Sequence, residues 1–322
     1  MVAAHAAARA PRLSGIRIDQ PWPWQAALSA LPAVAPSADW HYCAALCRDA
    51  QLLPLPNAAA VVRARTWRGA IDWCSPYGWA GWIGDGTADA WAAYDDAARQ
   101  AGAVCSFLIG CGAPPPGAEP YRTIYRAHLP SLLESGVRAL PKGSASALKA
   151  WLRRDAEMIE GAENLAEPLE TLYAQTMQRV GAGHAYRHAP GALARLAESH
   201  LAWLGGVREN DTVVAVTLLL ARGRHAEYFA FASTAAARHH ARGLLWRGYE
   251  RLAERGVEWI NLGGGVHEND GLAQFKHAMG GQPQTSWRVR AIHDGHAYEL
   301  LSAGLPPTEY FPPWHAVTVQ TP

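Results

Sequence analysis

Several features that would identify a ligand at once are missing from this sequence. Its 29 Lys and Arg residues balance 28 Asp and Glu residues, so the net charge is +1. Such a chain has no long-range field that attracts nucleic acid or an anionic membrane, and a site for a polyanion must be a local patch. No run approaches the roughly 20 apolar residues of a membrane-spanning helix. Residues 1–11 lack a compact apolar core, so we expect a tail there and not a secretion signal.

Cysteine and metal-ligand patterns are also sparse. The five cysteines form an odd set without any Cys-x-x-Cys pair or any histidine at zinc spacing. This usage is typical of a reduced, cytoplasmic protein, and we expect no metal site. The adjacent His239 and His240 do not change that expectation, because neighbours in sequence rarely point at one ion. The cysteines are Cys43, Cys47, Cys74, Cys105 and Cys111.

The length of 322 residues allows two domains of ordinary size. In the first half, the patterns predict a helix over 37–50 opened by Ser37 or Asp39, a strand pair around a turn at 65–69, and a helix over 87–102. Residues 121–129 alternate like an exposed edge strand. Residues 130–168 are predicted to be helical in two pieces. We place the domain junction there and predict domains 1–140 and 141–322.

The second half continues with helices and strands. Residues 169–181 and 189–200 are predicted helices, and three apolar runs at 202–208, 212–221 and 227–233 predict an antiparallel meander. An amphipathic helix over 242–255 and a strand over 257–262 follow. Helices and strands mixed in this order predict an α+β fold.

A glycine-rich motif follows that last strand. Asn261–Gly281 reads N-L-G-G-G-V-H-E-N-D-G-L-A-Q-F-K-H-A-M-G-G, with six glycines placed around a single lysine, Lys276. Glycine triplets at a strand end indicate unusual dihedral angles or a close approach to the main chain. The motif therefore predicts either a substrate beside the backbone or a tight turn without a ligand.

The motif and its surroundings resemble the FemABX family of acyltransferases. Residues 241–281 carry most of the resemblance, with a helix beginning near Gly243, a strand ending N-L-G-G-G, an acidic loop, and F-K-H followed by Gly-Gly. S-P-Y-G-W-A-G-W at 75–82, L-Y-A-Q-T-M-Q-R-V-G-A at 172–182 and Y-F-A-F-A-S at 228–233 agree in the right order. The resemblance implies two tandem GNAT-like domains, built of mixed, mostly antiparallel sheets flanked by helices.

Transfer of an acyl group onto an amine is the activity that the resemblance implies. The reaction passes through a tetrahedral oxyanion, which needs positive charge or hydrogen-bond donors. Lys276 matches the functional lysine of the family and is the predicted oxyanion stabiliser. The alternative is a surface lysine on a solvated helix face. Asp270 is a predicted catalytic base, although an aspartate before a helix is more often its N-cap.

Substrate-binding residues are predicted in two places. Gly263, Gly264 and Gly265 would border the donor or acceptor, and Tyr228 matches an aromatic position of the family that lines its site. Tyr77, in a segment bounded by proline and glycine, would line the acceptor site as a loop aromatic. Core packing is the alternative for Tyr77.

Phosphate groups of the donor call for arginine, lysine or a helix N-terminus. R-H-H-A-R-G at 238–243 half-matches the loop with which GNAT domains hold the pyrophosphate of CoA, so Arg238 and Arg242 are predicted phosphate ligands. Lys142 lies where the family often has a basic helical pair that contacts tRNA, but that cluster is thin here, which argues against a large tRNA footprint.

We therefore predict a cytoplasmic N-acyltransferase that moves an aminoacyl group from aminoacyl-tRNA to the amine of a peptide or small molecule. The partners are aminoacyl-tRNA and the amine acceptor, with no metal, redox cofactor or membrane span. One alternative is an acyl-CoA-dependent N-acyltransferase. The other is a non-catalytic binding module that kept the GNAT fold, which the absence of a carboxylate in 106–115 favours.

Overall fold

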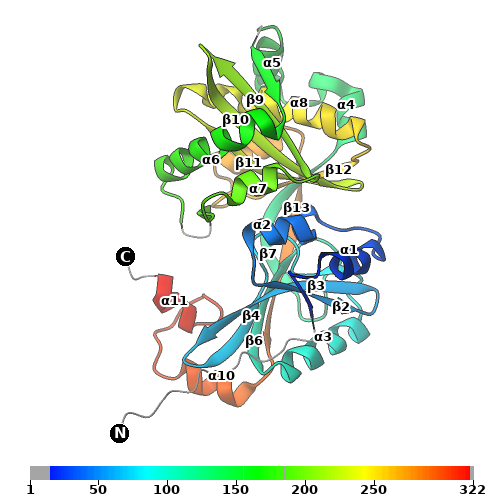
Figure 1. The fold of residues 1–322 in the computed structure, drawn as a ribbon, viewed down its shortest axis with the longest axis vertical. Helices are drawn as coiled ribbons and strands as arrows, with labels where there is room; N and C mark the ends of the chain where they lie inside the picture. The colour runs from blue at the N-terminus through cyan, green and yellow to red at the C-terminus, as the bar shows by residue number, and fades with distance from the viewer. Residues whose placement is uncertain (1–14, 155, 184–185, 320–322) are drawn as a thin grey trace. The chain divides into compact units, whose positions relative to one another are not determined.

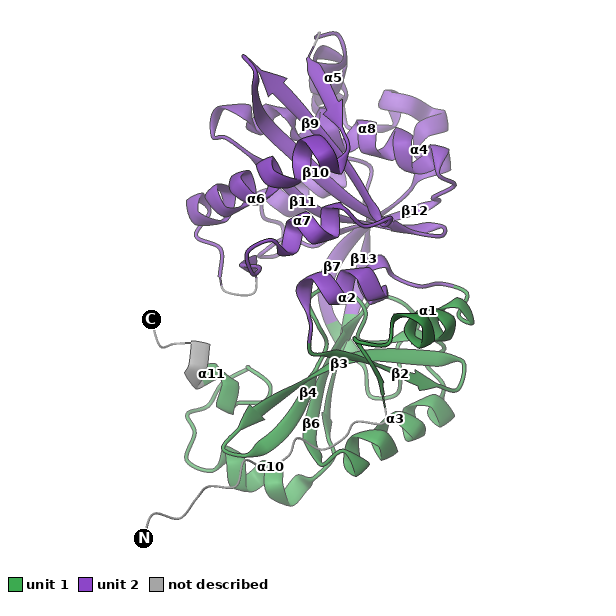
Figure 2. Ribbon diagram, viewed as in Figure 1, with its two compact units in different colours: residues 1–32, 49–120, 287–322 green, residues 33–48, 121–286 purple. Residues whose placement is uncertain are grey.

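The computed structural model describes residues 15–154, 156–183 and 186–319 (Figure 1). The chain divides into two compact units that alternate along the sequence (Figure 2). Unit 1 comprises residues 1–32, 49–120 and 287–322, and unit 2 comprises residues 33–48 and 121–286. The division into domains 1–140 and 141–322 stays a prediction, because neither compact unit corresponds to one half of the chain.

Unit 1 is a mixed sheet with helices. Its strands follow the order β1-β2-β3-β4-β6-β13, in which the β4 and β6 pair is parallel. β3 and β4 are joined by Arg68 and Gly69, both with positive φ, so the predicted turn is a two-residue hairpin turn. The elements are β1 (Ile16–Arg17), α1 (Pro21–Ser29), β2 (Ala50–Leu55), β3 (Ala58–Trp67), β4 (Ala70–Cys74), β5 (Ile83–Gly84), α3 (Ala88–Gln100), β6 (Ala103–Gly110), β13 (Gln282–Ile292), α10 (Gly295–Ser302) and α11 (Trp314–Val319).

Unit 2 also combines mixed-sheet strands with helices. Its strands follow the order β13-β7-β12-β11-β10-β9-β8, with a parallel β11 and β12 pair. The elements are η1 (Pro36–Ala38), α2 (Trp40–Leu46), β7 (Glu119–His128), α4 (Leu129–Ser135), η2 (Gly136–Ala139), α5 (Lys142–Leu152), β8 (Glu157–Glu160), α6 (Ala162–Arg179), α7 (Ala192–Ala197), β9 (Ala202–Glu209), β10 (Thr212–Arg222), β11 (His225–Ser233), η4 (Ala236–His240), α8 (Ala241–Glu254), β12 (Trp259–Gly263) and α9 (Gly271–Ala278).

Three local predictions are wrong in unit 2. β7 is not an edge strand, because it lies between β13 and β12. Residues 157–160, predicted to be helical, form β8 and pair with β9. The helix predicted to begin at 169 begins at 162 and continues through Pro168. In the described ranges, no helix combines the length and apolar character needed to cross a membrane.

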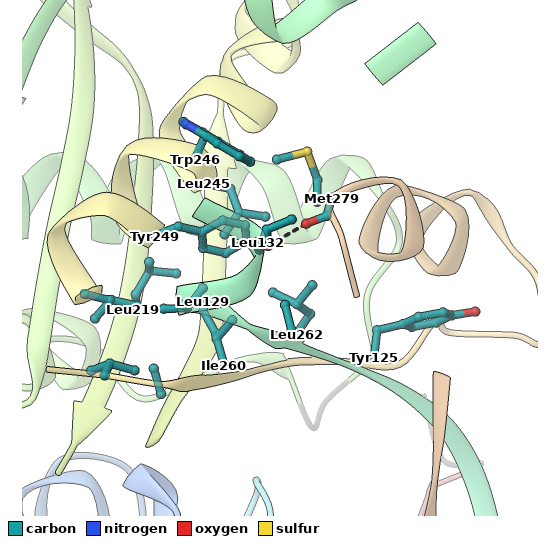
Figure 3. Packing of buried hydrophobic residues seen from close by; sticks show 14 of the residues in the cluster. Tyr125, Leu129, Leu132, Leu219, Leu245, Trp246, Tyr249, Ile260, Leu262 and Met279 are labelled. Atoms are coloured by element: carbon teal, nitrogen blue, oxygen red, sulfur yellow. Dashed lines mark hydrogen bonds between the residues drawn. The ribbon is translucent and has the colours of Figure 1, made fainter. Parts of the chain in front are cut away.

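A hydrophobic cluster sets the position of the glycine-rich motif. Leu245 and Tyr249 of α8 pack with Leu219 of β10 and with Ile260 and Leu262 of β12 (Figure 3). The Tyr249 hydroxyl donates a hydrogen bond of 3.2 Å to the carbonyl oxygen of Met279, directly after α9. The cluster therefore ties the end of α9 to the strand that precedes the motif.

The close packing of α8 on α5 depends on a glycine, which gives a first test of the fold. A Cβ at Gly243 would lie 2.0 Å from the ring of Trp151. We expect Gly243→Ala to lower the free energy of unfolding by about 1–3 kcal/mol through overpacking, although alanine is the better helix former. Chemical denaturation measures the change.

Gly143→Ala is the matched control, because Gly143 also lies in a helix and a Cβ there meets open space. This variant should be neutral or more stable by up to about 1 kcal/mol. Equal stabilities of the two variants would contradict the packing argument.

Candidate active site

Two parallel strands part from each other at the centre of unit 2. β11 and β12 pair through His225, Ala226 and Glu227, and the register ends at Glu227 opposite Asn261. Beyond that point, the pairs formed among the described residues join β11 to β10 and β12 to β7. β11 also has a bulge, because Leu218 faces Ala230, Leu219 faces Tyr228, and the register shifts by one residue between them. The strands therefore separate just before the glycine-rich motif.

The glycine triplet is packed against other parts of unit 2. Gly263 has φ of 70°, and a Cβ there would lie 3.2 Å from the Lys276 Nζ. A Cβ at Gly264 would lie 2.5 Å from the Thr123 carbonyl oxygen, and one at Gly265 would lie 2.4 Å from an Asp270 oxygen. The sequence predicted that some group comes close to the main chain at these glycines. In the structure, other residues of the protein make that approach. A substrate beside these glycines stays a prediction.

Lys276 is a buried cation on α9. Its side chain is 7% exposed, and Nζ donates a hydrogen bond of 2.5 Å to the Gly264 carbonyl oxygen. Burial lowers the pKa of this lysine to about 8, against the opposing charge of Asp270. An ammonium has three N–H donors, and in the described part of the chain only the Gly264 bond uses one. The alternative of a solvated surface lysine is therefore wrong.

Asp270 organises the loop that leads into α9. One carboxylate oxygen accepts from the Ala273 N–H at 2.8 Å, which is an N-cap. The other accepts from the N–H groups of Val266 at 2.7 Å and His267 at 3.0 Å. Burial raises the pKa of Asp270, but these backbone bonds outweigh it and the net pKa is lowered. The contacts favour the cap, and a role as base stays a prediction.

A pocket of about 140 Å³ lies beside the loop. It is lined by residues 121–123 and Tyr125 of β7, by residues 265–269 of the loop and by Ala273 of α9. The Arg122 guanidinium carbon lies 4.8 Å from the centre of the Tyr121 ring, and Tyr125 is a buried member of the apolar cluster, labelled in Figure 3. Arginine and aromatic side chains in a concave site are suited to a polar ligand with an apolar or planar part.

Two predicted residues lie on elements adjacent to the motif. Tyr228 is half-buried on β11, immediately after the last residue paired with β12, and burial raises its pKa. Arg242, at the start of α8, places its guanidinium carbon 5.6 Å from the ring centre of Phe275, the residue before Lys276. The Arg242 Nε is buried and has no hydrogen-bond partner in the described part of the chain. A buried, unsatisfied donor is costly without a ligand.

Within the described part of unit 2, Arg238 and Lys142 show no contact with Lys276. Arg238 is exposed, and its Nε donates to the Ala235 carbonyl oxygen in the same turn. Lys142 is exposed at the first residue of α5. Tyr77 is 39% exposed and belongs to unit 1, whereas Lys276 belongs to unit 2. Their predicted roles stay predictions.

Two clusters have side chains of the types that bind metals, but protein contacts already occupy them. In the cluster of Glu209, His239 and His240, the His240 Nδ1 accepts from the Trp151 Nε1 at 2.8 Å. Neutral His240 therefore carries its proton on Nε2, which donates to Glu209 at 2.9 Å and offers no lone pair. In the cluster of Asp39, His41 and His200, Asp39 pairs with Arg222 and caps α2.

One buried acidic residue was missed by the sequence analysis. Glu227 is 6% exposed on β11, and its Oε1 accepts from the Ser37 hydroxyl at 2.8 Å. Burial raises its pKa to about 7, and the bonds from Ser37 oppose the shift. Glu227 is the single acidic residue in the mostly apolar run of β11, and this sequence feature could have indicated it.

Comparisons with known proteins agree with this architecture. Residues 142–277, from α5 to the residue after Lys276, match the family described as an acetyltransferase (GNAT) domain. This segment is similar to GNAT domains. No curated protein matched the chain. A crystal structure of FemX is similar with a TM-score of 0.61 and 12% identity, over 76% of this chain and 87% of that one.

Two further solved structures are similar in fold to this chain. L-PGS from Bacillus licheniformis has a TM-score of 0.61 at 11% identity, over 88% of this chain and 95% of that one. The C-terminal domain of a lysylphosphatidylglycerol synthetase from Agrobacterium fabrum, described as putative, has a TM-score of 0.56 at 14% identity. The similarity covers 85% of this chain and 93% of that one. The chain therefore has a FemABX-like fold, and the predicted α+β, GNAT-like fold class is confirmed.

The burial of Lys276 can be measured directly, because the sequence has only three lysines, Lys142, Lys149 and Lys276. Lys142 and Lys149 are exposed. After reductive ¹³C-methylation, we expect NMR titration to give Lys276 a pKa of about 8, below the ordinary value of a lysine side chain. Asp270→Asn should lower the Lys276 pKa further, because it removes the charge that raises it. A Lys276 pKa at the ordinary lysine value would contradict the buried site.

Proposed function

We propose that the chain is an N-acyltransferase that forms an amide between a donor acyl group and an acceptor amine. The observation that carries the proposal is the buried Lys276 ammonium, which gives one hydrogen bond to Gly264 inside the segment that is similar to GNAT domains. A buried charge with unused donors is costly to fold, and such groups gather at functional sites.

The ammonium suits the electrostatics of acyl transfer. Attack of an amine on an ester or thioester carbonyl creates an oxyanion, which the two remaining N–H donors of Lys276 would stabilise. With a pKa of about 8, the group is mainly protonated at pH 7. Its burial strengthens the interaction with a developing negative charge, because little water screens it.

Aminoacyl-tRNA is the donor that we propose, with the amine of a peptide or small molecule as acceptor. The resemblance to the FemABX family supports this donor, and the similarity in fold to FemX agrees with it. Other structures with this fold are named as lysylphosphatidylglycerol synthetases, a name that denotes a lysyl group on a lipid. A lipid acceptor therefore belongs in any substrate screen.

An acyl-CoA donor is the second candidate. Arg242, the second residue of α8, has a buried Nε without a hydrogen-bond partner in the described part of the chain, and a phosphate would satisfy it. CoA and tRNA both carry phosphate, so Arg242 supports a phosphate-bearing donor of either kind. The half-match R-H-H-A-R-G lies at this same helix start.

The first test removes the charge on Lys276 and keeps the length of the side chain. We expect Lys276→Met to lower kcat about 10²–10³-fold, roughly 3–4 kcal/mol, because it removes the oxyanion donors. The assay offers charged tRNAs and acyl-CoAs with peptide, small-molecule and lipid amines, and mass spectrometry detects amide products. Lys149→Met, at an exposed lysine, is the matched control. Full activity of Lys276→Met would contradict the proposal.

The two donors are separated in the same assay. With an aminoacyl-tRNA donor, ribonuclease abolishes product formation and CoA does not raise the melting temperature. With an acyl-CoA donor, ribonuclease has no effect and CoA stabilises the protein by mass action. Tight ligand binding without turnover of any donor would instead support a non-catalytic binding module.

A further inference from the structure

The pocket beside the glycine-rich loop is lined by two charges of opposite sign that do not pair. Arg122 of β7 and Glu268 of the loop both line it. In the described part of the chain, neither side chain forms an ion pair or a hydrogen bond, and the Arg122 guanidinium contacts the Tyr121 ring. The two charges share one cavity without meeting, so a ligand that carries both signs of charge fits between them.

The backbone that presents each charge is held in place by the protein itself. The Ser286 hydroxyl, which is fully buried, donates to the Arg122 carbonyl oxygen at 2.8 Å and accepts from the Arg122 N–H at 3.2 Å. On the loop, the Asp270 carboxylate accepts from the N–H of His267, the residue before Glu268, at 3.0 Å. Both walls are therefore formed before a ligand arrives, which lowers the entropic cost of binding.

The pocket adjoins the site of the buried ammonium. Ala273 of α9 lines the pocket, and Lys276 follows it three residues later on the same helix. Residues three apart share one face of a helix, and both of these are buried. Gly265 also lines the pocket, directly after Gly264, whose carbonyl oxygen accepts from the Lys276 ammonium. A ligand in the pocket therefore lies beside the proposed oxyanion site.

Size and charge together define the class of ligand. The cavity of about 140 Å³ is well below the roughly 300–1,000 Å³ of pockets for drug-sized ligands, so the ligand is small. A guanidinium binds a carboxylate through two parallel hydrogen bonds. A simple carboxylic acid would be repelled by Glu268, and a simple amine would be repelled by Arg122. An α-amino acid carries both charges on one small molecule and satisfies both side chains.

We propose that this pocket binds a free α-amino acid, whose amine is the acceptor. This inference rests on the proposed N-acyltransferase function and names its acceptor. The carboxylate pairs with Arg122, and Glu268 holds the amine. Once the ammonium has lost one proton to water, the nitrogen attacks the donor carbonyl carbon. The C–N bond forms, the C–O or C–S bond to the donor breaks, and the leaving group takes a second proton from the nitrogen.

The test measures binding of L-alanine, L-alaninamide and L-lactate to the full chain by calorimetry at low ionic strength. Alaninamide lacks the carboxylate, and lactate lacks the amine. We expect the wild type to bind alanine about 10–100-fold more tightly than either analogue, because each analogue leaves one charge of the pocket unpaired. Arg122→Gln should abolish the preference for alanine over alaninamide alone. Glu268→Gln should abolish the preference over lactate alone.

Matched controls remove the same charges elsewhere in unit 2. Arg138→Gln and Glu134→Gln each replace an exposed residue and should leave both preferences unchanged. Arg122 and Glu268 are exposed as well, so their glutamine variants should keep the wild-type melting temperature within a few degrees. Preferences that fall equally in the control and pocket variants would reflect net charge and would overturn the assignment.

Turnover connects the pocket with the chemistry. In the assay with charged tRNAs and acyl-CoAs, mass spectrometry should detect alanine acylated on its nitrogen. Arg122→Gln should raise the KM for alanine about tenfold or more and leave the KM for alaninamide nearly unchanged. Lys276→Met should still bind alanine as the wild type does, because it removes the oxyanion donors and not the pocket.

The two proposals fail in different ways. If the wild type acylates other amines but neither binds nor acylates alanine, the pocket assignment is overturned and the N-acyltransferase proposal stands. If alanine binds with the expected preferences but no donor yields an amide, the N-acyltransferase proposal falls and the acceptor role falls with it. Binding of alanine no tighter than that of alaninamide and lactate is non-specific and also overturns the inference.

Discussion

The hydrogen bond from the Lys276 ammonium to the Gly264 carbonyl oxygen is the constraint on which the site depends. A cation taken out of water is destabilising unless its surroundings are arranged to hold it. Gly263 turns with a positive φ and leaves room for Nζ, while Gly264 packs on the backbone of β7. The cost of burying this charge would vanish with an apolar residue in its place. Its presence is therefore best explained by chemistry that requires a charge.

Local signals predicted much of this region. Thr87 and Asp270 were both placed at helix starts, and both cap their helices through side-chain hydrogen bonds. The order of motifs predicted the fold class, since the glycine triplet, the lysine and the preceding helix and strand are contiguous in the chain. Such features depend on neighbours within a few residues, which is why a sequence can carry them.

Contacts between segments that are distant in the sequence could not be predicted from local sequence patterns. Residues 33–48 belong to unit 2 although they precede most of unit 1, and Ser37 reaches Glu227 across 190 positions of sequence. The alternation of residues 121–129 predicted a strand correctly, but periodicity does not say which strands flank it. In the same way, a four-residue strand such as β8 exists because β9 pairs with it. Glu227 was missed because its burial depends on such long-range packing.

Burial acts on Glu227 and Lys276 in opposite senses, raising the pKa of the carboxyl and lowering that of the ammonium. A direct ion pair between the two side chains would reverse both shifts, because each charge would stabilise the other. The ammonium would then have its charge compensated before an oxyanion formed. In the described part of the chain, Lys276 forms no ion pair and gives one hydrogen bond to a neutral carbonyl oxygen, so its charge stays available for the proposed oxyanion.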